Sequence, residues 1–386
     1  MPLHYFDNNA TTQPAPEVVE AMQPSYATRW GNPSSLHQFG REVATDLDAA
    51  RQAVATLIGA PRASSVIFTS SGTEADNLAL FGLCAAQPTK RHLVTSTVEH
   101  AAVRNYCALL EEQGYTITRL PVAADGTLDP QQVADVCTPE TACVSLMWAN
   151  NETGVLFPIE QIAAICEERG VPFHCDAVQA IGKVSIDLCR HPIAALSLSG
   201  HKFHAPKGVG ALYLRPGTPF RPMFRGGGQE QGRRAGTENV AQIVGLGVAA
   251  TLARTHLSTV DTAVRALRDR MEHALLTRIP DMAINGHRTL RVANTTSVRM
   301  EGVDGEGMIL ALSEGGIAAS TGSACAAGSI EPSHVLRAMG FSNAEIRGTL
   351  RLSISRYTTN SDIDALLEQL PAIVATRRRL APPRRS

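Results

Sequence analysis

Short apolar runs alternate with amphipathic stretches between about residue 60 and residue 215. Seven of these runs are typical of β-strands, and the segments between several of them carry apolar residues at helical spacing. In chain order the runs are SSVIFTS, HLVTSTV, TITRLPV, ACVSLMWA, PFHCDAV, ALSLSG and VGALYLR. Strands that alternate with helices form a largely parallel sheet covered on both faces. The pattern therefore predicts an α/β fold in which ligands bind beyond the carboxyl ends of the strands.

The later part of the chain has a different pattern. Residues 255–278 place apolar side chains at helical spacing and predict one long amphipathic helix. The strand-like runs TTSVRM and LRLSIS follow it, on either side of GMILALSEGG. We therefore expect a large domain at residues 14–258 and a smaller α+β domain formed by residues 1–13 and 259–386. The Arg-rich stretch ATRRRLAPPRRS predicts a solvated, disordered end.

Composition narrows the classes of function. The 386 residues carry a net charge of −1, and no apolar run approaches the roughly 18 residues of a membrane helix. We therefore expect neither a nucleic acid nor a membrane as a partner. The N-terminus MPLHYFDNNATTQPAPE lacks the basic and apolar regions of a signal peptide. The eight cysteines form no C-x-x-C pair and suit reduced, mostly buried thiols, so we expect a cytoplasmic protein.

Ionisable side chains follow two of the predicted strands. Lys202, in LSLSGHKFHAPKG, is a candidate Schiff-base lysine, although a surface role or the neighbouring Lys207 would also fit. Asp176 ends the apolar run PFHCDAV, so its carboxylate emerges where ligands bind. A partly buried carboxylate needs a cationic partner, and the pyridinium nitrogen of pyridoxal phosphate (PLP) would serve as one. A cap on the following helix is the alternative. Gln179, three residues on, can donate to the phenolate oxygen of the same ring.

Three further segments would complete a site for this cofactor. In FTSSGTEADNLAL, Gly72 and Thr73 come between a strand and a helix, where free N–H groups bind phosphate, and Glu74 and Asp76 suit the first turn of the helix. His100, in VEHAAV, either stacks on a planar ring or is structural. The amides of ANNETG follow a strand and either reach a ligand or form a turn. Because the structural alternatives would all have to coincide, the set predicts a PLP enzyme of the aspartate-aminotransferase fold type.

Specific motifs are spread along nearly the whole chain. They are DNNATT, GNPSSLH, SSGTEADN, VEHAAV, ANNETG, DAVQAIGK, GHKFHAPKG, GGGQEQGRRAGTEN and STGSACAAG. From Asp7 to about Asp362 the chain resembles the cysteine desulfurases of the NifS/IscS class, and MWANNETG and GHKFHAPKGVGALYLR are most similar to the nitrogen-fixation members. The resemblance implies fold type I of the PLP-dependent transferases. Such a fold has a large domain with a mostly parallel seven-stranded sheet and a smaller α+β domain.

The resemblance also implies a role for each matching residue. Around the PLP ring it implies Lys202 as the Schiff-base lysine, Asp176 at the pyridine nitrogen, Gln179 at the phenolate oxygen, His100 stacked on the ring and Asn151 in contact with the cofactor. At the phosphate it implies Gly72, Thr73, Ser199, His201 and, from the other subunit of a homodimer, Thr237. At the substrate it implies Asn151, Arg351 and Asn9. Cys325 matches the nucleophile, with a transient iron–sulfur contact as a further role, and His100 is also a candidate for activating this thiol.

The implied reaction is a cysteine desulfurase reaction. It converts L-cysteine to L-alanine and leaves a persulfide on Cys325, whose sulfur passes to an iron–sulfur scaffold protein of the NifU type for nitrogenase maturation. Gly, Ala and Ser surround Cys325, so we expect residues 322–332 to form a mobile arm. Three alternatives stay open: a selenocysteine lyase, an aminotransferase, which would not need Cys325, and a non-enzymatic sulfur or metal carrier.

Overall fold

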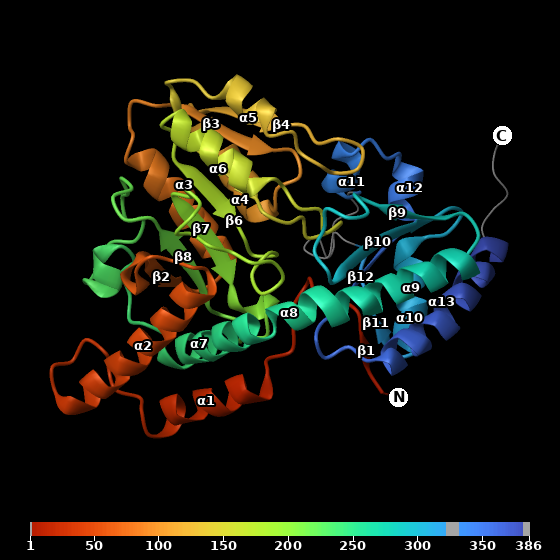
Figure 1. Ribbon diagram of the computed structural model, residues 1–386, viewed down its shortest axis with the longest axis horizontal. Helices are drawn as coiled ribbons and strands as arrows, with labels where there is room; N and C mark the ends of the chain where they lie inside the picture. Colours follow the sequence, from red (N-terminus) through yellow and green to blue (C-terminus); the bar gives the residue numbers. More distant parts are fainter. Residues whose placement is uncertain (1, 322–331, 381–386) are drawn as a thin grey trace.

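A seven-stranded sheet forms the centre of the larger part of the molecule (Figure 1). The computed structural model describes residues 2–321 and 332–380, so Cys325 and all of the predicted arm at 322–332 except its last residue lie outside the described residues. The strands are β2 Val66–Thr69, β3 His92–Ser96, β4 Thr116–Leu120, β5 Thr141–Met147, β6 Phe173–Asp176, β7 Ala195–Ser199 and β8 Gly210–Leu214. Their order is β2-β8-β7-β6-β5-β3-β4, and β8 runs antiparallel to both neighbours. The prediction of a mostly parallel sheet from seven apolar runs is confirmed.

Helices cover both faces of this sheet because its strands are apolar on both sides. Val66 and Phe68 of β2 join one apolar cluster, whereas Ile67 between them joins another, as the two-residue period of a strand requires. The first cluster is completed by α2 Gln38–Leu57, α6 Ile159–Glu168 and α7 Val240–Thr255, and the second by α3 Gly72–Ala85 and α4 Ala101–Glu112. Helix α1 Pro16–Ala27 packs on α7, and the short α5 Gln131–Val136 packs on α6.

A smaller sheet lies beside the large one (Figure 1). Its antiparallel strands are β9 Met282–Asn285, β10 Thr295–Met300 and β12 Thr349–Ser353, in the order β12-β10-β9. The helices around it are α9 Arg265–Arg278, α10 Gly305–Glu314 and α13 Asn360–Leu380. Strand β1 His4–Tyr5 pairs with β11 Ile317–Ala318, which brings the N-terminal segment into this part of the fold. The short helices α11 His334–Ala338 and α12 Asn343–Arg347 pack against the core of the large sheet through residues such as Leu336.

The helical connection between the two sheets is broken twice. The predicted helix over 255–278 begins at Leu257, after a bend of 56° that separates it from α7. It then runs through α8 Leu257–Thr259 and a π-helical turn, Val260–Val264, into α9. Among residues 2–321 and 332–380, no single helix is long and apolar enough to cross a membrane. Helix α7 and the helical segment after it would together be long and apolar enough, but they are separated by the bend. The domain boundary at residue 258 stays a prediction.

The C-terminal helix extends further than expected. Helix α13 continues to Leu380, so the prediction of a disordered end is wrong for residues 375–380. Arg377 donates to the carbonyl oxygen of Gly307 at 2.9 Å, and Arg378 donates to that of Glu301 at 2.9 Å. Arginines also suit the last turn of a helix, because its carbonyl groups carry partial negative charge. These contacts order a segment whose composition alone favours disorder.

Candidate active site

A cavity of about 240 Å³ lies at the carboxyl ends of the strands, where the N-terminal segment and β12 close it. Its lining includes eleven of the residues predicted from the sequence: Asn9, Gly72, Thr73, His100, Asn151, Asp176, Gln179, Ser199, His201, Lys202 and Arg351. Thr237 is exposed and lines a different hollow together with Arg234, so it does not join this site within one chain. Cys325 lies outside the described residues. The strand-end rule thus placed most of the candidate residues in one cavity.

The N-terminus of α3 forms one wall of the cavity. Ser71 caps the helix by accepting from the N–H of Glu74 at 3.1 Å, and Gly72 and Thr73 follow at the cavity wall. A Cβ on Gly72 would lie 2.9 Å from Val178 Cγ2 and 3.0 Å from Ser199 Cβ, so this close approach of backbone to its neighbours requires glycine. Glu74, in the first turn, forms an ion pair with Arg234 at 2.7 Å, so its negative charge is balanced by a neighbouring guanidinium. The wall therefore suits a phosphate, which a helix N-terminus attracts through N–H groups and the helix dipole.

Lys202 is held at the cavity by the N-terminal segment. It ends a 3₁₀ turn, Gly200–Lys202, directly after β7. Its Nζ donates to the carbonyl oxygens of Asn9 at 2.7 Å and Ala10 at 2.8 Å. His201 beside it contacts Thr11 Oγ1 through Nδ1 at 3.2 Å, and burial lowers the pKa of this imidazole to about 4, so the ring is neutral. An amine fixed in this way is placed to hold a cofactor aldehyde.

Three buried carboxyl groups lie at or near the cavity, and two of them, Asp176 and Asp76, line it. Asp176 ends β6, and its Oδ1 accepts from the N–H of Val178 at 2.9 Å. Burial raises the pKa of Asp176, while electrostatic interactions with His100 and then with Lys202 oppose that rise. Burial and then repulsion by Asp176 raise the pKa of Asp76 well above its usual value, and burial raises the pKa of Glu99 to about 8. Asp176 is therefore the carboxyl group best placed to carry the negative charge.

Asp76 differs from its predicted role. The acidic residue in the first turn of α3 is Glu74, whereas Asp76 is buried and lies 3.6 Å from Nε2 of His174. This imidazole is also buried, and desolvation lowers its pKa to about 3. It contacts Ser145 Oγ through Nδ1 at 2.9 Å and Ser197 Oγ through Nε2 at 2.9 Å. The expectation that Asp76 serves the helix dipole is therefore wrong, and Asp76 belongs to a buried polar cluster at the cavity wall.

His100 caps a helix and also lines the cavity. It precedes α4, and its Nδ1 accepts from the N–H of Ala102 at 3.2 Å. It also lines the cavity. The cap fixes the ring at the cavity wall, so the structural contact and a stacking role are compatible.

Arg351 and Asn9 close the cavity from the side of the smaller sheet. Arg351 is almost fully buried, and its Nη2 donates to Asp7 Oδ1 at 2.7 Å while its Nη1 donates to the carbonyl oxygen of Asn151 at 3.0 Å. The N–H of Asn9 donates to Ser353 Oγ at 2.9 Å, and its Nδ2 donates to Thr295 Oγ1 at 2.8 Å. The N-terminal segment is thereby fixed between the two sheets. Asn151 meets Arg351 through its backbone, which the motif alone could not show.

The residues present fit PLP. They supply an amine at Lys202, a buried carboxylate at Asp176, an amide at Gln179 and a close-packed helix N-terminus at Gly72. These are the groups that an aldehyde, a pyridine nitrogen, a phenolate oxygen and a phosphate require. Sequence reasoning missed the buried groups behind this lining, above all Lys183 and Glu99. The one available signal for Lys183 was its position four residues after Gln179 in DAVQAIGK.

Comparisons with known proteins agree with this site. Residues 4–366 match the model of the aminotransferase class-V family. The chain is 50% identical to the cysteine desulfurase NifS of Azotobacter vinelandii, over 98% of this chain and 94% of that protein. It is 52% identical to a cysteine desulfurase of Cereibacter sphaeroides, over 98% and 97% of the two chains. A solved NifS-like protein superposes with a TM-score of 0.91 at 34% identity, over 97% of this chain and all of that one. The chain therefore belongs to the aminotransferase class-V family and, within it, to the cysteine desulfurases.

Proposed function

We propose that the cavity takes sulfur from L-cysteine, releases L-alanine and leaves the sulfur as a persulfide on Cys325. The observation that carries this proposal is the convergence of Lys202, Asp176, Gln179 and Arg351 on one cavity. An amine, a buried carboxylate and an amide suit the PLP ring, and a guanidinium suits the carboxylate of an amino acid. A non-enzymatic sulfur or metal carrier would not require these four side chains around one cavity.

The cofactor of this family is PLP, which supplies an aldehyde that binds amines and a ring that accepts the electrons of a broken bond. We propose that Lys202 holds the aldehyde, Asp176 the pyridine nitrogen and Gln179 the phenolate oxygen. His100 covers the ring, while Gly72, Thr73, Ser199 and His201 hold the phosphate. The negative charge of Asp176 keeps a proton on the ring nitrogen, and this charge is sustained by the positive groups that oppose the rise in its pKa.

The remaining chemistry falls to side chains of the chain itself. Arg351 is fixed by Asp7 and by the carbonyl oxygen of Asn151, so its guanidinium is pre-oriented for the substrate carboxylate. The Nζ of Lys202, held by two backbone carbonyls, is placed to remove the proton from the substrate Cα and return it. Asn9 links these two groups, because its carbonyl oxygen accepts from Lys202 and its Nδ2 donates to the carbonyl oxygen of Asn151 at 3.2 Å.

The transfer of sulfur from the substrate to Cys325 needs no external oxidant or reductant. The thiolate sulfur of Cys325 forms an S–S bond as the Cβ–S bond of the substrate breaks. The electron pair of the broken bond stays with Cβ, which takes up a proton and becomes the methyl group of alanine. The thiolate is the reactive form of cysteine, so Cys325 must lose its proton before it attacks. We propose that His100, at the cavity wall, assists this loss.

The substitution Cys325→Ala tests the proposal directly. Alanine production from L-cysteine should collapse, while the visible absorption band of the bound cofactor stays. Undiminished alanine production would show that Cys325 is not the nucleophile and would favour another PLP reaction. A selenocysteine lyase is distinguished by comparing the rates on L-cysteine and L-selenocysteine, and we expect the higher rate on L-cysteine.

We propose that the enzyme works as a homodimer and passes its sulfur to an iron–sulfur scaffold protein of the NifU type in nitrogenase maturation. The exposed position of Thr237, away from the cavity of its own chain, supports a role in the cavity of a second chain. Exposed apolar side chains between α1 and α2 support a subunit interface, since Trp30 and Leu36 are 69% and 88% exposed. All seven described cysteines are free and six are buried, which supports a reducing cytoplasmic setting.

A further inference from the structure

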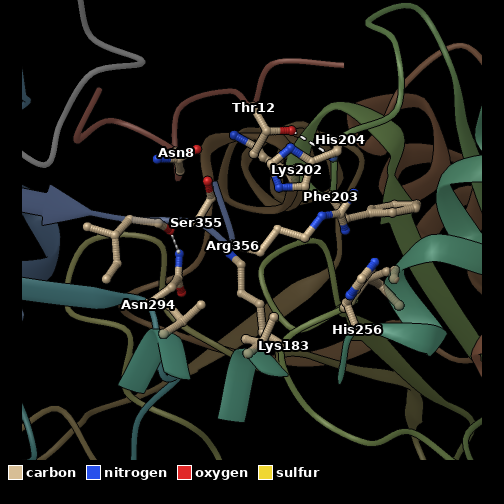
Figure 2. A pocket seen from close by; sticks show the side chains of 16 residues that line it. Asn8, Thr12, Lys183, Lys202, Phe203, His204, His256, Asn294, Ser355 and Arg356 are labelled. Atoms are coloured by element: carbon tan, nitrogen blue, oxygen red, sulfur yellow. Dashed lines mark hydrogen bonds between the residues drawn. The ribbon is translucent and has the colours of Figure 1, made fainter. Parts of the chain in front are cut away.

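A second lysine lies buried beneath the cavity. Lys183 is only 9% exposed. It lies in the turn after β6, directly after Gly182, which has a φ of +71°. It lines a small hollow of about 40 Å³ that Lys202 reaches from the other side, and Arg356 lines the same hollow (Figure 2). Lysine is rarely buried to this extent unless its charge is satisfied. The contacts of Lys183 therefore require a reason.

These contacts are with amide groups. Nζ of Lys183 donates to Oε1 of Gln179 at 2.7 Å and to Oδ1 of Asn9 at 3.4 Å. No ion pair joins Lys183 to a carboxylate among the described residues. Burial, and then the positive charges of Lys202 and Arg351, lower the pKa of Lys183 to about 7. Two amide oxygens compensate only part of this cost, so stability alone does not account for a lysine here.

The contact with Gln179 determines how that side chain is oriented. Nζ of Lys183 donates to Oε1 of Gln179, and in its ammonium form it can only donate, so it faces the oxygen of the amide and not its nitrogen. The amide nitrogen is thereby turned the other way. One of its hydrogens is donated to the carbonyl oxygen of Asn9 at 3.0 Å. Gln179 also lines the cavity, where the second hydrogen is available to an acceptor.

The same hydrogen bonds connect Lys183 to the proposed cofactor lysine. The carbonyl oxygen of Asn9 accepts from Nε2 of Gln179 and from Nζ of Lys202 at 2.7 Å. The Asn9 side chain is oriented in a similar way, because Oδ1 accepts from Lys183 and from Nδ2 of Asn294 at 3.1 Å. Without Lys183, the Gln179 amide would lose the hydrogen bond to its oxygen, and among the described residues only its bond to the Asn9 carbonyl would orient it. The Asn9 amide would still be held by Asn294 and Thr295.

We propose that Lys183 is a positioning residue that fixes the Gln179 amide with its N–H group toward the phenolate oxygen of PLP. The inference deepens the proposed function and rests on the role given there to Gln179. It predicts that the effect of Lys183 on the cofactor depends on the presence of Gln179.

A double-mutant cycle on the holoenzyme and the apoprotein tests this route. The variants are Lys183→Met, Gln179→Leu and both together, with the exposed Lys207→Met as a control. The readouts are the visible absorption maximum of the bound cofactor and the dissociation constant of PLP from the apoprotein. We expect each single variant at Lys183 and Gln179 to shift the band and to weaken PLP binding by roughly 10-fold, the size of one charge-assisted or oriented hydrogen bond. The double variant should match Gln179→Leu, and Lys207→Met should match the wild type.

The outcomes separate the inference from the proposed function. If Gln179→Leu shifts the band and Lys183→Met does not, or if their effects add in the double variant, the inference is overturned. If Gln179→Leu itself changes nothing, the role of Gln179 in the proposed function is wrong, and the inference is overturned with it. Lys183→Arg keeps a group that only donates and should restore the wild-type band. Should Lys183→Met fail to fold, Lys183→Gln replaces it, because a neutral amide no longer selects the oxygen of Gln179.

Discussion

Buried charge is treated in opposite ways on the two sides of the cavity. On one side, the carboxyl groups of Asp176, Asp76 and Glu99 lie near one another, and burial raises the pKa of each. On the other side, Lys183 and Lys202 donate to amide and carbonyl oxygens of Asn9, Ala10 and Gln179.

The comparison shows how the protein limits charge in this region. Burial raises the pKa of Glu99 to about 8 and lowers that of Lys183 to about 7, so both shifts move a side chain toward its neutral form near physiological pH. Asp176 is the exception among the carboxyl groups, because His100 and Lys202 counteract part of the shift in its pKa. The negative charge is therefore concentrated at the end of β6, where the proposed pyridine nitrogen would be bound.

The largest expected effect comes from removing the amine on the basic side. Lys202→Ala eliminates both the proposed attachment of the cofactor and the proposed proton-transfer group. Alanine production should fall by roughly 10²–10⁴-fold, the range of a lost general base, and the visible band of the internal attachment should disappear. Absorption spectra and product analysis check this result. A variant with the normal band would show that another lysine, such as Lys207, holds the cofactor.

A buried ion pair away from the cavity gives a contrasting case. Arg291 and Glu272 form a bidentate pair with contacts of 2.5 and 2.7 Å, and both side chains are buried. Arg291→Met leaves the Glu272 carboxylate buried and unpaired, which should destabilise the fold by about 3–5 kcal/mol. Urea unfolding measures this loss. The kcat of the folded fraction should stay near that of the wild type, and a large fall in kcat would show that charge outside the cavity also serves the reaction.

On the acidic side, Asp176→Asn removes the charge with little change in shape. We expect alanine production to fall by about 10²-fold, because an amide cannot keep a proton on the ring nitrogen. The pKa of Glu99 should also fall, since the charge of Asp176 contributes to raising it. Steady-state rates and the pH dependence of unfolding report the two effects. The exposed Asp135→Asn serves as the matched control, and equal rates in the two variants would refute the role of Asp176.

A further test on the acidic side is stability as a function of pH. The folded pKa of Glu99, about 8, lies above the ordinary value of 4.5, so the folded state retains a proton that the unfolded chain loses between these values. This contribution to stability is full below about pH 4.5 and is lost as the pH rises to about 8, by at most about 1.4 kcal/mol per pH unit. Glu99→Gln should therefore narrow the difference in unfolding free energy between pH 5 and pH 8. The exposed Glu112→Gln serves as the control and should leave that difference unchanged. An unchanged difference in Glu99→Gln as well would show that the Glu99 carboxyl is ionised in the folded state.

The parts of the site that the sequence revealed are those with a local signal. Asp176 and Lys202 each follow an apolar strand, and Gly72 lies between a strand and a helix, so each was visible within about ten residues of sequence. The seven strands were visible for the same reason, since fully apolar runs mark a sheet that is buried on both faces.

The parts that escaped depend on contacts between distant segments. Lys183 is informative only because Asn9, 174 residues earlier, lies beside it. Asp76 was expected to face the helix terminus, but its neighbour His174 belongs to a strand almost a hundred residues away. The helical end of α13 likewise depends on Arg377 reaching Gly307, 70 residues away. Periodicity and motif spacing describe neighbours along the chain, and these contacts arise only when the chain is folded.

The transfer of sulfur to Cys325 is the central claim, and the mass of its cysteine peptides tests it most directly. The holoenzyme is treated with L-cysteine in the absence of reductant, digested without reduction, and analysed by mass spectrometry. We predict the added mass of one sulfur atom on the peptide that contains Cys325, together with an equivalent amount of alanine. The peptide of Cys189, the one exposed thiol among the described cysteines, should be unchanged. Added sulfur on Cys189 and none on Cys325, or alanine formation without any persulfide, would contradict the account.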